Sequence, residues 1–147
     1  MLGAAPLRAA TSVTQLRTGL DLLAAGKGQA GLGQRVALLT HAGAVDARGR
    51  RSVDVVHGLL GDRLTALLSP EHGLAGKVAA GEKVADDRDA ASGLPIISLY
   101  GARREPPSEL LERIDTLVID LQDVGLRPFT YAATMADCLR AAARHKL

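Results

Sequence analysis

Short apolar runs alternate along the chain with segments whose apolar residues recur every three or four positions. The runs at 35–40, 64–69, 94–99 and 116–121 have the length of a strand and lack a polar face. Strands that are apolar on both faces are typical of a parallel sheet that helices cover on both sides. The pattern therefore predicts four buried parallel strands.

The segments between these runs carry helical signals. Apolar residues follow helical spacing at 13–24, 52–60 and 130–146, and Pro106 opens a shorter helix through Ile114. The last helix has one predominantly apolar side, made of Ala132, Met135, Ala136, Leu139 and Ala143. Helices that connect parallel strands predict an α/β fold, a Rossmann-like sheet with helices on both faces.

The domain organisation follows from the same pattern. Residues 1–12 show no period and are expected to form a loose lead-in, and 13–147 are expected to form one domain. Because no strand follows the last helix, we expect a partial domain that lacks later strands. The segment 74–93 is longer than an ordinary connection, and two interpretations stay open: a functional lid or a solvated insertion.

Charge and composition narrow the possible partners. The formal net charge is +2 and the Arg residues are scattered, which argues against a nucleic-acid partner. The chain has no apolar run of 18 residues and no visible signal peptide, so we expect no membrane partner and a cytoplasmic location, with an exported form left open. The lone Cys138 lies in the last predicted helix, where we expect it to be a small core residue.

Polar side chains gather where the predicted strands end. In a parallel sheet these ends share one edge, where ligands usually bind in α/β proteins. The candidates are Thr40, His41, Ser69, Glu71, His72, Tyr100, Asp120, Gln122 and Asp123. A pair of carboxyl groups at such an edge can perform acid and base chemistry. The alternative for each Asp is a helix cap or turn residue, and for Ser69 a structural hydroxyl.

Other chemistries have weaker signals. The chain contains neither G-x-G-x-x-G after the first strand nor G-x-x-x-x-G-K-[ST], so we expect no nucleotide cofactor. The spacing H-x-x-x-H is also absent, and we expect no metal, although His41, His72, Asp120 and Asp123 leave that option open. Ser69 lacks the G-x-S-x-G elbow of a serine nucleophile.

The ordered set of motifs resembles one family, the exo-β-N-acetylmuramidases of the NamZ type, formerly a domain of unknown function. The matching pieces cover nearly the whole chain from Thr18. They are Thr18–Asp21, Val36–Thr40 with Gly43, Ser69–Gly73, Gly93–Pro95, Ser98–Gly101, Asp120–Gly125 with Arg127, and Thr130–Tyr131.

The resemblance implies a Rossmann-like catalytic domain of a glycosidase that removes N-acetylmuramic acid from the non-reducing end of peptidoglycan fragments, in cell-wall recycling. In that family the glutamate of the Glu-His-Gly motif is the proposed catalytic acid, which corresponds to Glu71. A protonated carboxyl group at the leaving oxygen is what glycoside hydrolysis requires. We expect His72 to orient Glu71, and Asp120 or Asp123 to supply the second carboxylate.

Further residues of the matching motifs are expected to contact the sugar. Arg127 could pair with the lactyl carboxylate, because a guanidinium group suits a carboxylate, or form a salt bridge with Asp123. The remaining expected contacts are His41, Ser69, Tyr100, Gln122 and Tyr131.

The sequence departs from the family pattern at His41, Ala75 and Pro128–Phe129, which can change the sugar contacts. The resemblance also implies further strands and a C-terminal domain in full-length members. The alternative function is therefore a non-catalytic domain that binds muropeptides or a partner protein, or that self-associates through an uncovered sheet edge.

Overall fold

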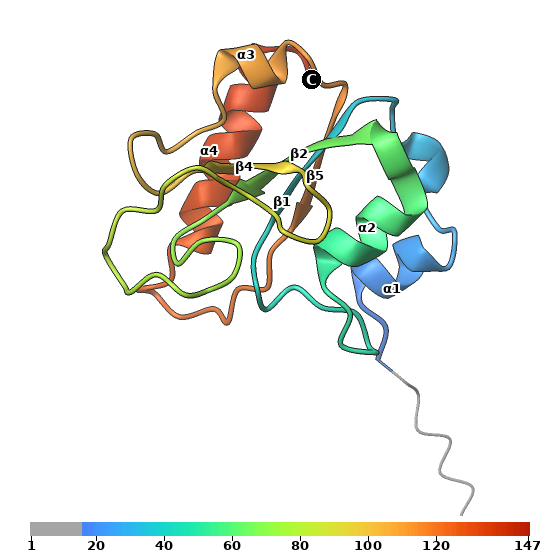
Figure 1. Ribbon diagram of the computed structural model, residues 1–147, viewed down its shortest axis with the longest axis horizontal. Helices are drawn as coiled ribbons and strands as arrows, with labels where there is room; N and C mark the ends of the chain where they lie inside the picture. The colour runs from blue at the N-terminus through green and yellow to red at the C-terminus, as the bar shows by residue number, and fades with distance from the viewer. Residues whose placement is uncertain (1–15) are drawn as a thin grey trace, which may run out of the picture.

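The fold is a five-stranded sheet between two layers of helices in a computed structural model, which describes residues 16–147 (Figure 1). The strands are β1 Val36–Thr40, β2 Leu64–Ser69, β3 Asp87–Arg88, β4 Pro95–Ser98 and β5 Thr116–Asp120. The α-helices are α1 Gly19–Ala24, α2 Ser52–Leu60, α3 Ser108–Leu111 and α4 Tyr131–Arg144. Short 3-10 helices lie at Gln29–Gly31 and Gly61–Arg63.

The sheet confirms the predicted α/β class. Its strand order is β3-β4-β2-β1-β5, and β4, β2, β1 and β5 run parallel. One strand departs from the prediction, since β3 lies in the long segment where the sequence predicts no strand, and it pairs antiparallel with β4. Two residues are too few to give a periodic signal, which is why the pattern misses β3.

The core has two halves, one on each face of the sheet. Helices α1 and α2 cover one face and α3 and α4 the other (Figure 1). Successive residues of β1 alternate between these faces: Leu38 packs with the α2 side, whereas Ala37 and Leu39 pack with the α3 and α4 side. All five residues of β1 are buried, as expected for a central strand of a covered parallel sheet.

Two helices differ from their predictions. Helix α1 begins at Gly19 rather than at Val13, because the Thr18 hydroxyl accepts a hydrogen bond from the Asp21 N–H and the Asp21 carboxylate caps the Thr18 N–H. This capping box sets the start of the helix. The predicted lead-in at 1–12 and the residues 13–15 lie outside the described residues.

Helix α4 packs on a side other than the one that the apolar pattern marks. Met135 and Leu139 are exposed. The buried residues of the helix are Tyr131, Thr134, Cys138, Ala141 and Ala142. An alanine-rich helix offers more than one apolar stripe, and the small side chains fit closest to the sheet. Burial of Cys138 agrees with the role predicted for it.

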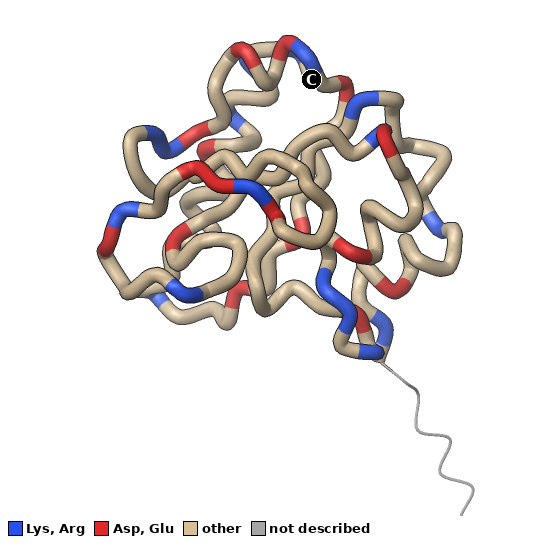
Figure 2. Tube along the Cα trace, in the orientation of Figure 1, with Lys and Arg blue, Asp and Glu red and all other residues tan. Residues whose placement is uncertain are grey.

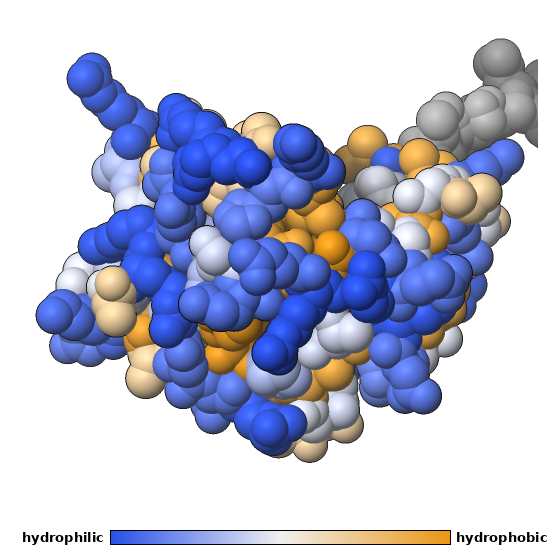
Figure 3. Space-filling model, turned by 90° about the horizontal axis from the view of Figure 1, so that it is seen from above, coloured by the Kyte–Doolittle hydropathy of each residue, from blue (hydrophilic) through white to orange (hydrophobic). Residues whose placement is uncertain are grey.

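Surface properties follow the composition. Acidic and basic residues are interspersed along the trace (Figure 2), and on the face seen in Figure 3 apolar surface appears in patches between hydrophilic side chains. No helix among residues 16–147 combines the length and the apolar character needed to cross a membrane. Among the described residues, β5 pairs with β1 alone, so β5 is an outer strand of the sheet.

Candidate functional site

The carboxyl ends of the parallel strands bring most of the predicted site residues to one edge of the sheet. Thr40 at the end of β1 is in register with Asp120 at the end of β5, and Ser69 at the end of β2 is in register with Ser98 of β4. The loops after these ends carry Glu71 and Tyr100, among other predicted site residues. Their common location follows from parallel pairing, which points all strand ends the same way.

Glu71 lies at the centre of this edge and is 8% exposed. Its Oε1 accepts a hydrogen bond from the Gly81 N–H at 2.8 Å, and its Oε2 accepts one from the Thr130 hydroxyl at 2.8 Å. The carboxylate therefore ties the loop after β2 to the segment before β3 and to the start of α4. Three stretches of chain that are distant in sequence meet at one side chain.

The surroundings of Glu71 favour its ionised form. Burial acts to raise its pKa, but hydrogen bonds from Gly81, Thr130 and Tyr100 and the charge of His72 outweigh burial and hold the pKa below the ordinary value of 4.5. The protein thus holds Glu71 as a carboxylate at neutral pH. A general acid needs the opposite state, so proton donation from Glu71 requires a change in these contacts.

A chain of contacts leads from Glu71 towards β1 and β5. The Tyr131 hydroxyl donates to the Glu71 carbonyl oxygen at 3.5 Å, and the Tyr131 ring meets the His41 ring edge-on with centroids 4.7 Å apart. The Gln122 N–H donates to Nε2 of His41 at 3.0 Å. Four predicted site residues are therefore linked by direct contacts.

Burial and nearby charge set the pKa values of the rings in this chain. Burial lowers the pKa of His41, and the charge of Asp120 opposes that effect only in part. Burial and the charges of Glu71 and Asp123 raise the pKa of Tyr131. At neutral pH His41 is a neutral imidazole and Tyr131 a neutral phenol.

The predicted acidic partners differ in their surroundings. Oδ2 of Asp120 and the hydroxyl of Thr40 are buried and have no hydrogen-bond partner among residues 16–147. In contrast, Asp123 accepts a hydrogen bond from the Gly125 N–H at 2.7 Å, the contact of a turn residue. Of the two residues, Asp120 is the one with a buried carboxylate oxygen that has no hydrogen-bond partner among the described residues.

Arg127 is exposed and forms no ion pair within the described part of the chain. The salt bridge to Asp123 considered from the sequence is thus absent. Another basic residue, Arg104, lies with its guanidinium carbon 4.0 Å from the centroid of the Tyr100 ring. Residue type alone does not single out Arg104, because the contact depends on how the chain turns after β4.

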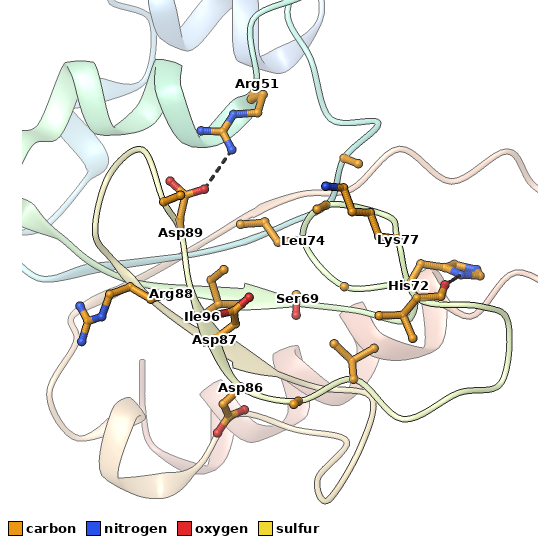
Figure 4. Close-up of a pocket in the computed structure, with 17 residues that line it drawn as sticks. Arg51, Ser69, His72, Leu74, Lys77, Asp86, Asp87, Arg88, Asp89 and Ile96 are labelled. Atoms are coloured by element: carbon orange, nitrogen blue, oxygen red, sulfur yellow. Dashed lines mark hydrogen bonds and ion pairs between the residues drawn. The ribbon is translucent and has the colours of Figure 1, made fainter.

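Ser69 and His72 line a separate cavity of about 690 Å³ beneath the segment that leads to β3 (Figure 4). Nδ1 of His72 lies 2.8 Å from the Val78 carbonyl oxygen, which can only accept, so Nδ1 carries the proton. Glu71 is not among the residues that line this cavity.

The rest of this cavity combines apolar walls with charged groups. Leu74 and Ile96 are among its apolar residues, Arg51 and Asp89 form an ion pair of 2.9 Å across one side, and Lys77 lies on another side (Figure 4). The Ser69 hydroxyl is buried and has no hydrogen-bond partner among the described residues. The predicted site residues are thus divided between the surroundings of Glu71 and this neighbouring cavity.

Two residues that hold Glu71 were missed by sequence reasoning. Thr130 lies in one of the motifs that resemble the family, yet nothing in that motif marks its hydroxyl as the partner of Glu71. Gly81 contributes a backbone N–H, which carries no signature of residue type. No group of three His, Cys, Asp or Glu side chains that could hold a metal occurs within residues 16–147.

Comparisons with known proteins point to one family. The family model described as "Exo-beta-N-acetylmuramidase NamZ, N-terminal" matches residues 36–147. The "Peptidoglycan beta-N-acetylmuramidase NamZ" of Bacillus subtilis strain 168 is 38% identical over 128 residues, which are 87% of this chain and 31% of that protein. The chain therefore spans about a third of the length of this curated relative.

Solved structures show the same relationship. A DUF1343 family protein of Bacteroides fragilis NCTC 9343 matches 88% of this chain with a TM-score of 0.76 and 39% identity. A second DUF1343 protein of that organism matches 87% with a TM-score of 0.65 and 25% identity. The chain covers 32% and 31% of these two proteins.

Proposed function

Because the chain belongs to the family of NamZ N-terminal domains, we propose that it removes N-acetylmuramic acid from the non-reducing end of peptidoglycan fragments. The curated relative is a peptidoglycan β-N-acetylmuramidase, and the match covers 87% of this chain. The reaction is hydrolysis of a glycosidic bond during turnover of the cell wall. The cytoplasmic location and the absence of nucleic-acid and membrane partners stay predictions from the sequence.

The observation that carries this proposal is the position of Glu71 among groups from the end of β4, the segment before β3 and the start of α4. Glycoside hydrolysis needs a carboxyl group that can protonate the leaving oxygen and a second carboxylate that acts on the anomeric carbon or on water. Glu71 is proposed as the proton donor and Asp120 as the second carboxylate. The geometry supplies both groups at the same edge of the sheet.

Proton donation from Glu71 requires its pKa to rise when substrate binds. The Thr130 hydroxyl holds the carboxylate and the Tyr100 hydroxyl helps to lower its pKa, and a hydroxyl can turn to a new acceptor. A sugar that draws either hydroxyl away removes a donor that favours ionisation, and its own bulk excludes water from Glu71. Both effects raise the pKa of Glu71.

The other predicted contacts fit the same proposal. His41, Gln122 and Tyr131 form the wall between Glu71 and the end of β5, where they can contact the sugar ring. His72 and Ser69 face the neighbouring cavity, which offers room for a further part of the glycan. Roles for Asp123 and Arg127 in sugar binding stay predictions.

One observation favours a second function, a binding domain without turnover. Glu71 is ionised, buried and supplied with hydrogen bonds, which is also how a structural carboxylate looks. A chain that spans about a third of its curated relative could hold muropeptides while the reaction depends on other parts of a longer protein. Self-association through β5 is a further prediction of this second function.

A release assay separates the two functions. The protein is incubated with a disaccharide that carries N-acetylmuramic acid at its non-reducing end, and the free sugar is measured by mass spectrometry. Release supports the muramidase. Binding of the disaccharide by calorimetry without release supports the binding domain, and neither binding nor release contradicts both.

A further inference from the structure

Arg104 is an exposed basic residue whose position is fixed by an aromatic ring. Its guanidinium carbon lies 4.0 Å from the centroid of Tyr100. Within residues 16–147 it forms no ion pair, whereas the adjacent Arg103 pairs with Asp86 at 2.8 Å. Stacking on an aromatic face leaves the N–H groups at the edge of a guanidinium group available to an anion.

The same ring connects Arg104 to Glu71. A side-chain hydrogen bond from Tyr100 is one of the contacts that lower the pKa of Glu71. One face of the Tyr100 ring therefore carries a cation, and the same side chain contributes to the lowered pKa of the carboxylate proposed to act on the glycosidic bond. Arg104 and Glu71 are therefore neighbours of the same tyrosine side chain.

The position of Arg104 suits an anionic substituent of the sugar. A carboxylate binds a guanidinium group through two parallel hydrogen bonds, and stacking on Tyr100 orders the guanidinium group before the ligand arrives. Arg127, which the sequence suggests for this purpose, has no comparable contact that fixes its side chain among the described residues.

We propose that Arg104 binds the carboxylate of the sugar on which Glu71 acts, and so selects an acidic N-acetylated sugar over its neutral analogue. This inference rests on the proposed function. N-Acetylmuramic acid differs from N-acetylglucosamine by a lactyl ether that ends in a carboxylate, so this one group is what Arg104 distinguishes. Arg104 is a specificity-determining residue, and proton transfer stays with Glu71.

The test compares the binding of these two free sugars to the full chain by calorimetry or NMR titration. For the unsubstituted protein we expect tighter binding of N-acetylmuramic acid. Arg104→Gln should weaken that binding by about tenfold to a hundredfold, the range for loss of a charge-assisted contact, and leave N-acetylglucosamine unaffected. Arg104→Lys keeps the charge and should retain part of the preference.

Two further variants serve as comparisons. Arg113→Gln removes an equal charge from an exposed residue just before β5, at the opposite edge of the sheet, and should change neither affinity. Arg127→Gln removes the other basic residue that the sequence suggests for this carboxylate, so it compares the two candidate partners directly. The inference is overturned if Arg104→Gln keeps the full preference, if Arg127→Gln abolishes it instead, or if the unsubstituted protein does not prefer N-acetylmuramic acid.

These outcomes are distinct from a failure of the proposed function. Binding of free sugars requires no turnover, so the preference can be measured whether or not the release assay succeeds. Release of N-acetylmuramic acid at an unchanged rate by Arg104→Gln would leave the muramidase proposal standing and remove Arg104 from it. Thermal unfolding of each variant shows whether it folds, and Arg104→Lys gives a second variant with the stacked cation retained.

Discussion

The hydrogen bond from Thr130 to Glu71 is expected to stabilise the fold only while Glu71 is ionised. Thr130 is the N-cap of α4, yet its side chain makes no capping bond, so its hydroxyl acts on Glu71 rather than on the helix end. Thr130→Val removes that donor and nearly preserves the shape of the side chain. Glu71 keeps its other donors, so the change isolates one contact.

The magnitude follows from the kind of bond that is lost. A hydrogen bond to a buried charged group contributes about 1.5–3 kcal/mol, so Thr130→Val should lower the free energy of unfolding by about that amount at pH 7. The variant should also have a higher pKa at Glu71, because one of the donors that favours ionisation is gone.

The dependence on pH gives the sign of the effect. The pKa of Glu71 in the folded protein lies below its ordinary value of 4.5, so its ionisation stabilises the fold above that pH, and this contribution disappears as pH falls through the folded pKa. The free energies of unfolding of the unsubstituted protein and of Thr130→Val should therefore differ most at neutral pH and converge in strong acid. Urea unfolding followed by circular dichroism measures this difference, since the chain has no Trp.

Thr134→Val is the matched control. The Thr134 hydroxyl donates to the Thr130 carbonyl oxygen at 3.2 Å, which is a bond between neutral groups. Its loss should cost about 0.5–1.5 kcal/mol at every pH. If Thr130→Val lowers the free energy of unfolding equally at neutral and acidic pH, or does not lower it at all, the Thr130 hydroxyl does not hold an ionised Glu71.

Two further predictions concern the packing of the domain. Gly33→Ala should destabilise the protein by about 1–3 kcal/mol in thermal unfolding, since its Cβ would meet the side chains of Asp115 and Thr116, with the Thr116 hydroxyl 2.8 Å away. Gly31→Ala, where nothing lies within 4 Å, is the control, and equal melting temperatures for the two variants would contradict this. Cys138 is completely buried and its thiol pKa is raised to about 12. A thiol reagent should therefore label it only after unfolding. Rapid labelling of the folded protein would contradict this and show that α4 opens readily.

The parallel strands could be predicted because their signal is local. Strands such as Val36–Thr40 are buried on both faces, and such strands can be recognised in the sequence as continuous runs of apolar residues. The shared edge for Glu71, Tyr100 and Asp120 then followed from the parallel arrangement. The predicted start of α1 was wrong, because the capping box at Thr18 sets the start of the helix and the helical spacing of apolar residues before Thr18 does not.

The state of Glu71 could not be predicted from the sequence. Its donors include a backbone N–H of Gly81 and the hydroxyl of Thr130, which lies 59 positions away in the chain. Neither contact leaves a pattern in residue type, so the expected acid is found as a carboxylate. The side of α4 that packs was also ambiguous, because an alanine-rich helix is apolar around much of its circumference.

The central claim is that the carboxyl group of Glu71 carries the cleavage of the glycosidic bond. The most direct measurement is the initial rate at which Glu71→Gln releases N-acetylmuramic acid from the disaccharide, compared with Thr130→Val, which removes a hydrogen bond to Glu71 but keeps the carboxyl group. We expect Glu71→Gln to lose release while Thr130→Val retains it. Release by Glu71→Gln at the rate of the unsubstituted protein would contradict the account.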